Sequence, residues 1–191
     1  MRGLTFWLVI FHQLLFQGMF GIRNVTLRRK IGQPIRGKNI EARLSIIFFA
    51  LFIAMAIGIS AYPGAPGTFR VMSPSLSMGL GGFLLLISLF LSLAALIGLR
   101  DSWRVGVVDG QRTELITDGI YRLTRNPYFV SYLLMFFGYT LLLQNVILLV
   151  LSCIAFGFIH WMIRREESYL TEVHGERYLE YKRRVPRYLF F

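Results

Sequence analysis

The chain has little of what soluble domains and cysteine-based metal sites are built from. Cysteine occurs once, at Cys153, which excludes a disulfide framework and any metal site made of cysteines. Charged residues make up only 16% of the chain, and 10 Asp and Glu stand against 21 Lys and Arg. With 55% hydrophobic and 15% aromatic residues, the composition is typical of an integral membrane protein.

The shortage of acidic residues leaves a formal net charge of +11. A basic surplus of this size ordinarily suggests nucleic acid as a partner. Here, however, the charges alternate with long apolar runs and form no basic stripe of the kind that binds nucleic acid. We therefore expect no nucleic acid and predict anionic lipid head groups as the partner of the basic segments.

Long apolar stretches dominate the chain, and four of them approach or exceed the roughly 18 to 20 residues that cross a bilayer. The stretch over residues 127–163 has double length and a polar break at Gln144-Asn145, which predicts a hairpin of two helices. The sequence thus predicts an all-α integral membrane protein with about five transmembrane helices in one membrane domain, residues 1–191. The predicted helices cover residues 4–22, 44–62, 76–99, 128–143 and 146–163.

The positions of Lys and Arg predict the orientation. Of the 21, 19 fall in three segments: residues 23–43, 100–125 and the region from 164 onward. Because basic residues accumulate on the cytoplasmic side, we expect the N-terminus outside and the C-terminus inside a bacterial inner (cytoplasmic) membrane. A cytoplasmic C-terminal helix is predicted from residue 164 to 184, with Gly175 placed to interrupt it.

The predicted hairpin brings two polar clusters to the same face. Two helices of about 18 residues each rise about 27 Å, enough to cross and return. Arg125-Asn126-Pro127 before the hairpin and Arg164-Arg165-Glu166-Glu167 after it are therefore expected side by side. Adjacent carboxylates at a membrane boundary are costly unless they are solvated, paired or bind a cation. Salt bridging with the nearby arginines and a ligand site are both open interpretations.

The same residues resemble a known family. Thr113-Glu114-Leu115-Ile116-Thr117-Asp118-Gly119-Ile120-Tyr121, followed by Arg125-Asn126-Pro127, resembles the isoprenylcysteine carboxyl methyltransferase family and its phospholipid methyltransferase relatives. So do Arg165-Glu166-Glu167, the run His174-Gly175-Glu176-Arg177-Tyr178-Leu179-Glu180-Tyr181, and Val185-Pro186. The resemblance covers roughly residues 95–188, and it is the order and spacing of the pieces that make it specific.

The resemblance implies a membrane methyltransferase that uses S-adenosylmethionine, with a lipophilic small molecule or lipid entering from the bilayer. The acceptor would be a carboxylate, amine or thiol, and the cofactor pocket would lie on the cytoplasmic side. The expected cofactor-binding residues are Thr113, Glu114, Leu115, Ile116, Tyr121, Asn126, Pro127, Tyr128, Phe129, Glu166 and Glu167. The expected substrate-binding residues are Arg125, Met162, Arg164 and Arg165. Neither a metal nor a directly catalytic side chain is expected, because in-line methyl transfer mainly needs alignment and exclusion of water.

Three positions depart from the family pattern. The histidine before the proline is Asn126, the motif's tyrosine falls at Phe129, and the substrate-binding arginine falls at Met162. Asparagine can hydrogen-bond but cannot take up a charge, which argues against a proton-transfer role at that position. The departures keep open a non-catalytic membrane scaffold or lipid-binding protein of the same architecture. A second alternative is an NADPH-dependent reductase of the sterol type, whose helical core resembles that of this family.

Overall fold

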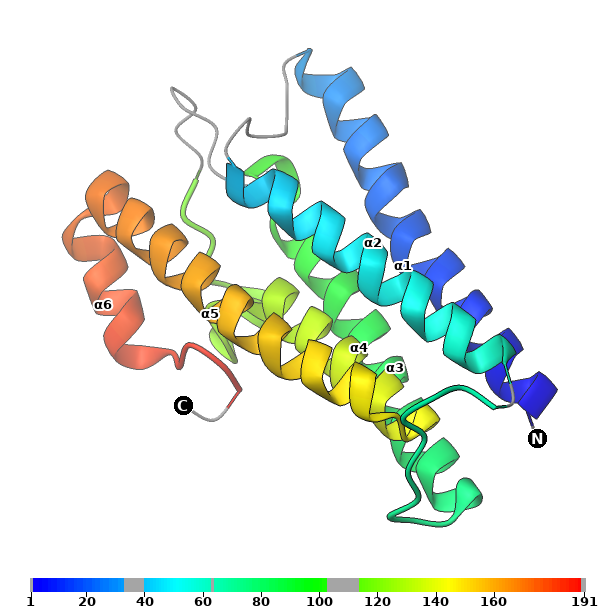
Figure 1. The fold of residues 1–191 in the computed structure, drawn as a ribbon. Coiled ribbons are helices and arrows are strands. Elements are labelled where there is room, and N and C mark those ends of the chain that lie inside the picture. The colour runs from blue at the N-terminus through cyan, green and yellow to red at the C-terminus, as the bar shows by residue number, and fades with distance from the viewer. Residues whose placement is uncertain (1, 33–39, 63, 103–113, 190–191) are drawn as a thin grey trace.

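The computed structural model describes residues 2–32, 40–62, 64–102 and 114–189. Long α-helices account for most of these residues, packed as a slanted bundle (Figure 1). They are α1 (Arg2–Ile31), α2 (Ile40–Ala61), α3 (Pro74–Gly98), α4 (Pro127–Leu143) and α5 (Val146–His174), with the shorter α6 (Glu176–Arg184) and the 3-10 turns η1 (Arg100–Ser102) and η2 (Gly119–Arg122). The predicted all-α membrane architecture is confirmed.

Within the described ranges, four helices are long and apolar enough to cross a membrane: α1, α2, α3 and α5. The fifth apolar helix, α4, has 17 residues. At 1.5 Å per residue it rises about 26 Å, slightly less than the roughly 30 Å hydrocarbon core. Most of its residues are buried, so α4 lies inside the bundle rather than against lipid. The exact number of crossings and the orientation stay predictions.

Two helices run past their predicted ends. Helix α1 continues through its basic last turn to Ile31, and α5 continues through the charged segment to His174. Polar residues such as Arg, Lys and Glu are good helix formers, so leaving the apolar region does not end a helix. Gly175, with a φ of 55°, ends α5 in the left-handed region that favours glycine. The predicted C-terminal helix is therefore the end of α5 plus α6.

The polar break predicted between α4 and α5 forms a tight turn. Gln144 has a φ of 43°, and the side chain of Asn145 accepts a hydrogen bond from the amide of Ile147 at 2.9 Å. The Gln144 side-chain oxygen also accepts from the amide of Val71 at 3.0 Å, which fixes the loop before α3 on the turn. The two residues thus end one helix, begin the next and hold the loop.

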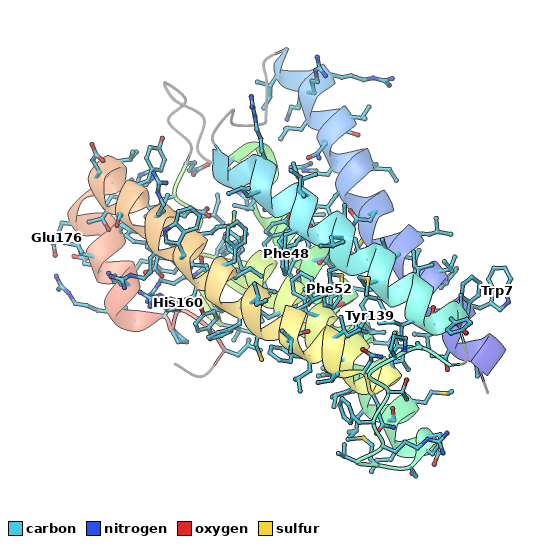
Figure 2. All side chains as sticks on the ribbon, viewed as in Figure 1. Trp7, Phe48, Phe52, Tyr139, His160 and Glu176 are labelled. Atoms are coloured by element: carbon cyan, nitrogen blue, oxygen red, sulfur yellow. The ribbon has the colours of Figure 1, made fainter. Side chains whose placement is uncertain are left out.

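Helix α1 joins the bundle through buried polar and aromatic side chains. The ring nitrogens of His12 contact the Tyr139 hydroxyl at 2.7 Å and the Ser88 hydroxyl at 3.0 Å. Helix α2 also contributes an aromatic ring: Phe52 packs on Phe136, with ring centroids 4.4 Å apart, and lies near Tyr139 (Figure 2). Polar groups that face one another inside an apolar bundle specify which helices pack together.

Helices α3 and α4 approach closely because of two glycines. A Cβ on Gly81 would lie 2.8 Å from the backbone nitrogen of Leu142 and 2.9 Å from the carbonyl oxygen of Gly138. Those atoms belong to the backbone of α4 and cannot rotate away. Small residues at such contacts allow the helix backbones to meet, which is the main source of attraction between helices in lipid.

Replacing Gly81 by Ala is expected to destabilise the protein by about 1 to 3 kcal/mol, because the new methyl group overpacks the contact. The measurement is thermal unfolding of the detergent-purified protein. Gly82→Ala is the matched control, because nothing lies within 4 Å of a Cβ at that position. Both changes gain the same helix propensity, so equal melting temperatures would contradict the predicted contact.

Candidate functional site

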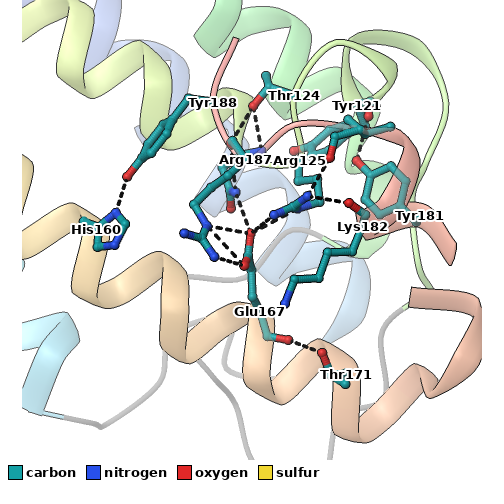
Figure 3. A network of polar contacts seen from close by, with 12 residues as sticks. Tyr121, Thr124, Arg125, His160, Glu167, Thr171, Tyr181, Lys182, Arg187 and Tyr188 are labelled. Carbon is teal, nitrogen blue, oxygen red and sulfur yellow. Dashed lines mark hydrogen bonds and ion pairs between the residues drawn. The ribbon is translucent and has the colours of Figure 1, made fainter. Parts of the chain in front are cut away.

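Glu167 of α5 lies at the centre of a buried ion-pair network (Figure 3). Its Oε1 accepts hydrogen bonds from Nε and Nη2 of Arg125 at 3.1 and 2.9 Å, and its Oε2 accepts from Nη2 of Arg187 at 2.8 Å. The side chains of Glu167 and Arg125 are only 4% and 6% exposed. The two polar clusters at the ends of the hairpin thus lie side by side, as the sequence predicts.

Arg125 is held entirely inside the protein. Besides binding Glu167, its Nη1 donates to the carbonyl oxygens of Lys182 at 2.9 Å and Val185 at 2.5 Å. The guanidinium therefore connects the start of α4 with α5 and the end of α6. Arg125, expected from the sequence to bind substrate, has its donors occupied by these contacts.

The residues after α6 fold back onto the start of α4. The carbonyl oxygen of Arg187 accepts from Thr124 Oγ1 at 2.8 Å and from Asn126 Nδ2 at 3.2 Å, and the Arg125 amide donates to the Pro186 carbonyl at 3.0 Å. Asn126, in the position of the family's histidine, also lies 3.5 Å from Glu167 Oε1. Its amide therefore fastens the C-terminal segment to the site.

Sequence reasoning missed Arg187. Its hydrogen bond to Glu167 raises the pKa of the guanidinium, so the charge persists. The only signal in the sequence was a basic residue directly after the Val185-Pro186 motif. Its partner, Glu167, lies 20 residues earlier in the sequence, on α5.

Glu166 has a different environment from its neighbour. One residue along an α-helix turns the side chain by about 100°, so Glu166 leaves the arginine network. It makes no hydrogen bond or ion pair with the residues that the structure describes, and its electrostatic neighbours are Glu167, Tyr121, Tyr128 and Tyr178. The side chain is solvent-exposed although protein atoms surround it densely.

Aromatic residues lie near the side chain of Glu166. Tyr121 is 6% exposed, and its carbonyl oxygen accepts from the Tyr181 hydroxyl at 2.6 Å, which fastens η2 to α6. The Tyr128 ring contacts those of Phe20 and Phe129, at centroid distances of 4.9 and 5.8 Å. Tyr121 and Tyr128, two of the predicted cofactor-binding residues, therefore lie near the Glu166 carboxylate.

The other residues predicted to bind cofactor or substrate differ in their burial. Leu115 packs on a small core formed by Tyr178, Tyr181 and Val185. The remaining positions are as follows: Glu114 is exposed, Ile116 and Pro127 are buried, Met162 is half-buried, Arg164 and Arg165 are exposed on α5, and Thr113 lies outside the described residues. Arg165 lies over the ring of Trp161, 5.6 Å from its centroid.

Two buried polar atoms beside the network lack partners in the described part of the chain. They are the hydroxyl oxygen of Tyr178 and Nε2 of His174. The electrostatic neighbours of Tyr178 include Glu167, Arg125 and Glu166. Buried polar groups in folded proteins are nearly always hydrogen-bonded, so an unsatisfied hydroxyl next to an unpaired carboxylate suits a polar ligand.

Comparison with known proteins gives the same family as the motifs. The phospholipid methyltransferase family model matches residues 76–177. The protein-S-isoprenylcysteine O-methyltransferase of Schizosaccharomyces pombe is 36% identical over 73 residues, 38% of this chain and 31% of that protein. Protein-S-isoprenylcysteine O-methyltransferase B of Arabidopsis thaliana is 36% identical over 78 residues, 38% of each chain. The Xenopus laevis protein-S-isoprenylcysteine O-methyltransferase is 38% identical over 78 residues, 40% of this chain and 27% of that protein.

These alignments span about a third of the length of the curated relatives. The family model, in contrast, matches more than half of this chain, and its range contains most of α3, all of α4, and Glu166 and Glu167 of α5. The family predicted from the motifs is therefore confirmed. The chain belongs to the phospholipid methyltransferase family, with similarity to its isoprenylcysteine O-methyltransferases.

Proposed function

We propose that the protein is a membrane-embedded methyltransferase that transfers a methyl group from S-adenosylmethionine to a lipophilic small molecule or lipid. The acceptor atom belongs to a carboxylate, amine or thiol. The observation that carries the proposal is the unpaired Glu166 carboxylate beside Tyr121 and Tyr128, in a chain of this family.

The two adjacent glutamates have different roles in this proposal. Glu167 is engaged by two arginines and holds the start of α4, α5 and the C-terminal segment together. Glu166 is exposed and makes no such ion pair in the described residues. The salt-bridge interpretation thus suits Glu167, and the ligand interpretation suits Glu166.

The side chains around Glu166 fit the cofactor. The carboxylate can accept charge-assisted hydrogen bonds from an ammonium group or from ribose hydroxyls. The rings of Tyr121, Tyr128 and Phe129 offer faces for an adenine ring and for a positively charged sulfonium. The Tyr178 hydroxyl supplies a donor that lacks an internal partner. When bound, S-adenosylmethionine supplies the activated methyl group.

The chain's own residues then have to align the reactants and exclude water. The Arg125–Glu167–Arg187 network fastens the C-terminal segment over the start of α4, which closes one side of the site. A carboxylate acceptor is already ionised near neutral pH and needs no base, whereas an amine would first have to lose a proton.

We also propose that the site faces the cytoplasm of a bacterial cell. The basic last turns of α1 and α6 support this orientation, because both lie at the end of the bundle where the site is (Figure 1). Basic segments of this kind accumulate on the cytoplasmic side and attract anionic lipid head groups. The acceptor would enter from the bilayer.

The direct test is calorimetric titration of S-adenosylhomocysteine into the folded, detergent-purified protein. We expect saturable binding. No binding at millimolar concentrations would refute the proposed cofactor. A parallel titration with NADPH addresses the reductase alternative, and binding of NADPH alone would support that alternative.

Replacing Glu166 by Gln is expected to weaken S-adenosylhomocysteine binding roughly 10- to 100-fold, because a charged hydrogen bond contributes about 1.5 to 3 kcal/mol. The fold should remain, since Glu166 has no structural partner in the described residues. Glu172→Gln is the control, because it removes the same charge from an exposed position of the same helix. Equal affinities for the two variants would exclude Glu166 from the binding site.

Replacing Glu167 by Gln should instead destabilise the fold by about 3 to 5 kcal/mol, because it leaves the buried Arg125 without its counter-charge. Glu180→Gln removes the carboxylate of an exposed pair with Arg184, so its effect should stay below about 0.5 kcal/mol. Thermal unfolding in detergent measures both. If the two variants unfolded at the same temperature, the network would not have the structural role assigned to it.

A further inference from the structure

A groove of about 220 Å³ lies between α5 and the C-terminal segment, lined by Phe156, His160, Arg187 and Tyr188. The three rings stack: Phe156 and His160 each lie about 6 Å from Tyr188, with interplanar angles of 29° and 26°. His160 Nδ1 and the Tyr188 hydroxyl are 2.8 Å apart, which fixes the two rings against each other (Figure 3). The groove therefore has a rigid, mostly apolar wall.

The groove is accessible from outside the bundle, because Phe156 in its wall is 40% exposed. Arg165 over the Trp161 ring marks the depth of the membrane–water interface, where tryptophan and basic residues are enriched. A lipid chain in the adjacent leaflet can thus reach the groove directly.

Arg187 gives this apolar groove a positive end. Its Nε and Nη2 are used by Glu167, whereas Nη1 has no hydrogen-bond partner in the described residues. Two arginines share the single carboxylate of Glu167, so among the described residues the network has one positive charge more than it has negative charges. The lining residues include no acid. The side chain of Arg187 is 27% exposed, so an anion can approach it.

We propose that the groove binds a long-chain carboxylate, with its tail along the rings and its head group on Nη1 of Arg187. The small volume suits one chain rather than a two-chain phospholipid. The single excess charge suits a monoanion, because a phosphate dianion would place additional negative charge beside Glu167. The groove is formed by other residues than those proposed to hold the cofactor, and its ligand goes beyond the proposed methyl transfer.

The test is calorimetric titration of oleate and of oleyl alcohol into the full chain in a neutral detergent, without cofactor. The wild-type protein should bind oleate about tenfold more tightly than the alcohol, because only oleate forms a charged hydrogen bond. Arg187→Met should abolish this preference, and the fold should remain because Glu167 keeps Arg125. Arg164→Met is the matched control: it removes an exposed charge from the same region and should keep the preference.

A second pair of variants tests the tail contact. Phe156→Ala should weaken the binding of both oleate and oleyl alcohol about fivefold, because part of the apolar wall is lost. Ile154→Ala, also exposed on α5, should bind both as the wild type does. This pair leaves the Glu167 network intact, so it stays informative if Arg187→Met unfolds.

Three results would overturn the proposal. They are a preference for oleate that survives in Arg187→Met, an equal loss in Arg164→Met, and tighter binding of oleoyl lysophosphatidate than of oleate. The second result would mean general attraction to a basic surface, and the third would mean a phosphate site. Because no cofactor is present, these outcomes are independent of the titration with S-adenosylhomocysteine.

Discussion

The site depends on one buried carboxylate placed between two arginines. Removing charges from water is costly, and a buried ion pair is tolerated only when its remaining hydrogen-bonding groups are satisfied. Arg125 meets this condition with two backbone carbonyls from the end of α6, whereas Arg187 is partly exposed and binds the second carboxylate oxygen of Glu167. Because Glu167 binds both arginines, the start of α4, α5 and the C-terminal segment are held in one arrangement. The position of the neighbouring Glu166 side chain on α5 follows from that arrangement.

Hydropathy predicted most of the bundle. Lipid leaves a chain few options, so apolar length alone located five helices, and Gln144-Asn145 located the turn between the last two. The ends of α1 and α5 were predicted too early, because apolar length reports where the membrane ends and not where the helix ends. The α3–α4 contact was not predicted, since Gly81 and Gly82 look alike in sequence and only their facing backbones distinguish them.

The candidate site was only partly predictable for a similar reason. The hairpin placed Asn126 and the two glutamates on one face, which the structure confirms. Which glutamate is paired depends on the rotation of α5 and on a segment that folds back from 20 residues away. Asn126 is predicted to bind cofactor, and its contact with the Arg187 carbonyl could not be predicted from the sequence. Local patterns contain no information about such distant contacts, so the role of Arg187 appeared only with the fold.

The return of the C-terminal segment also has a consequence for synthesis. Arg187 follows the five long helices that the structure describes, so it leaves the ribosome after α4 and α5 have been made. Until then Glu167 has only Arg125, and the carbonyl partners of Arg125 at Lys182 and Val185 are also still missing. The hairpin can therefore enter the membrane before its polar boundary is neutralised. The site is then completed by the docking of a short polar segment, rather than by the insertion of a helix.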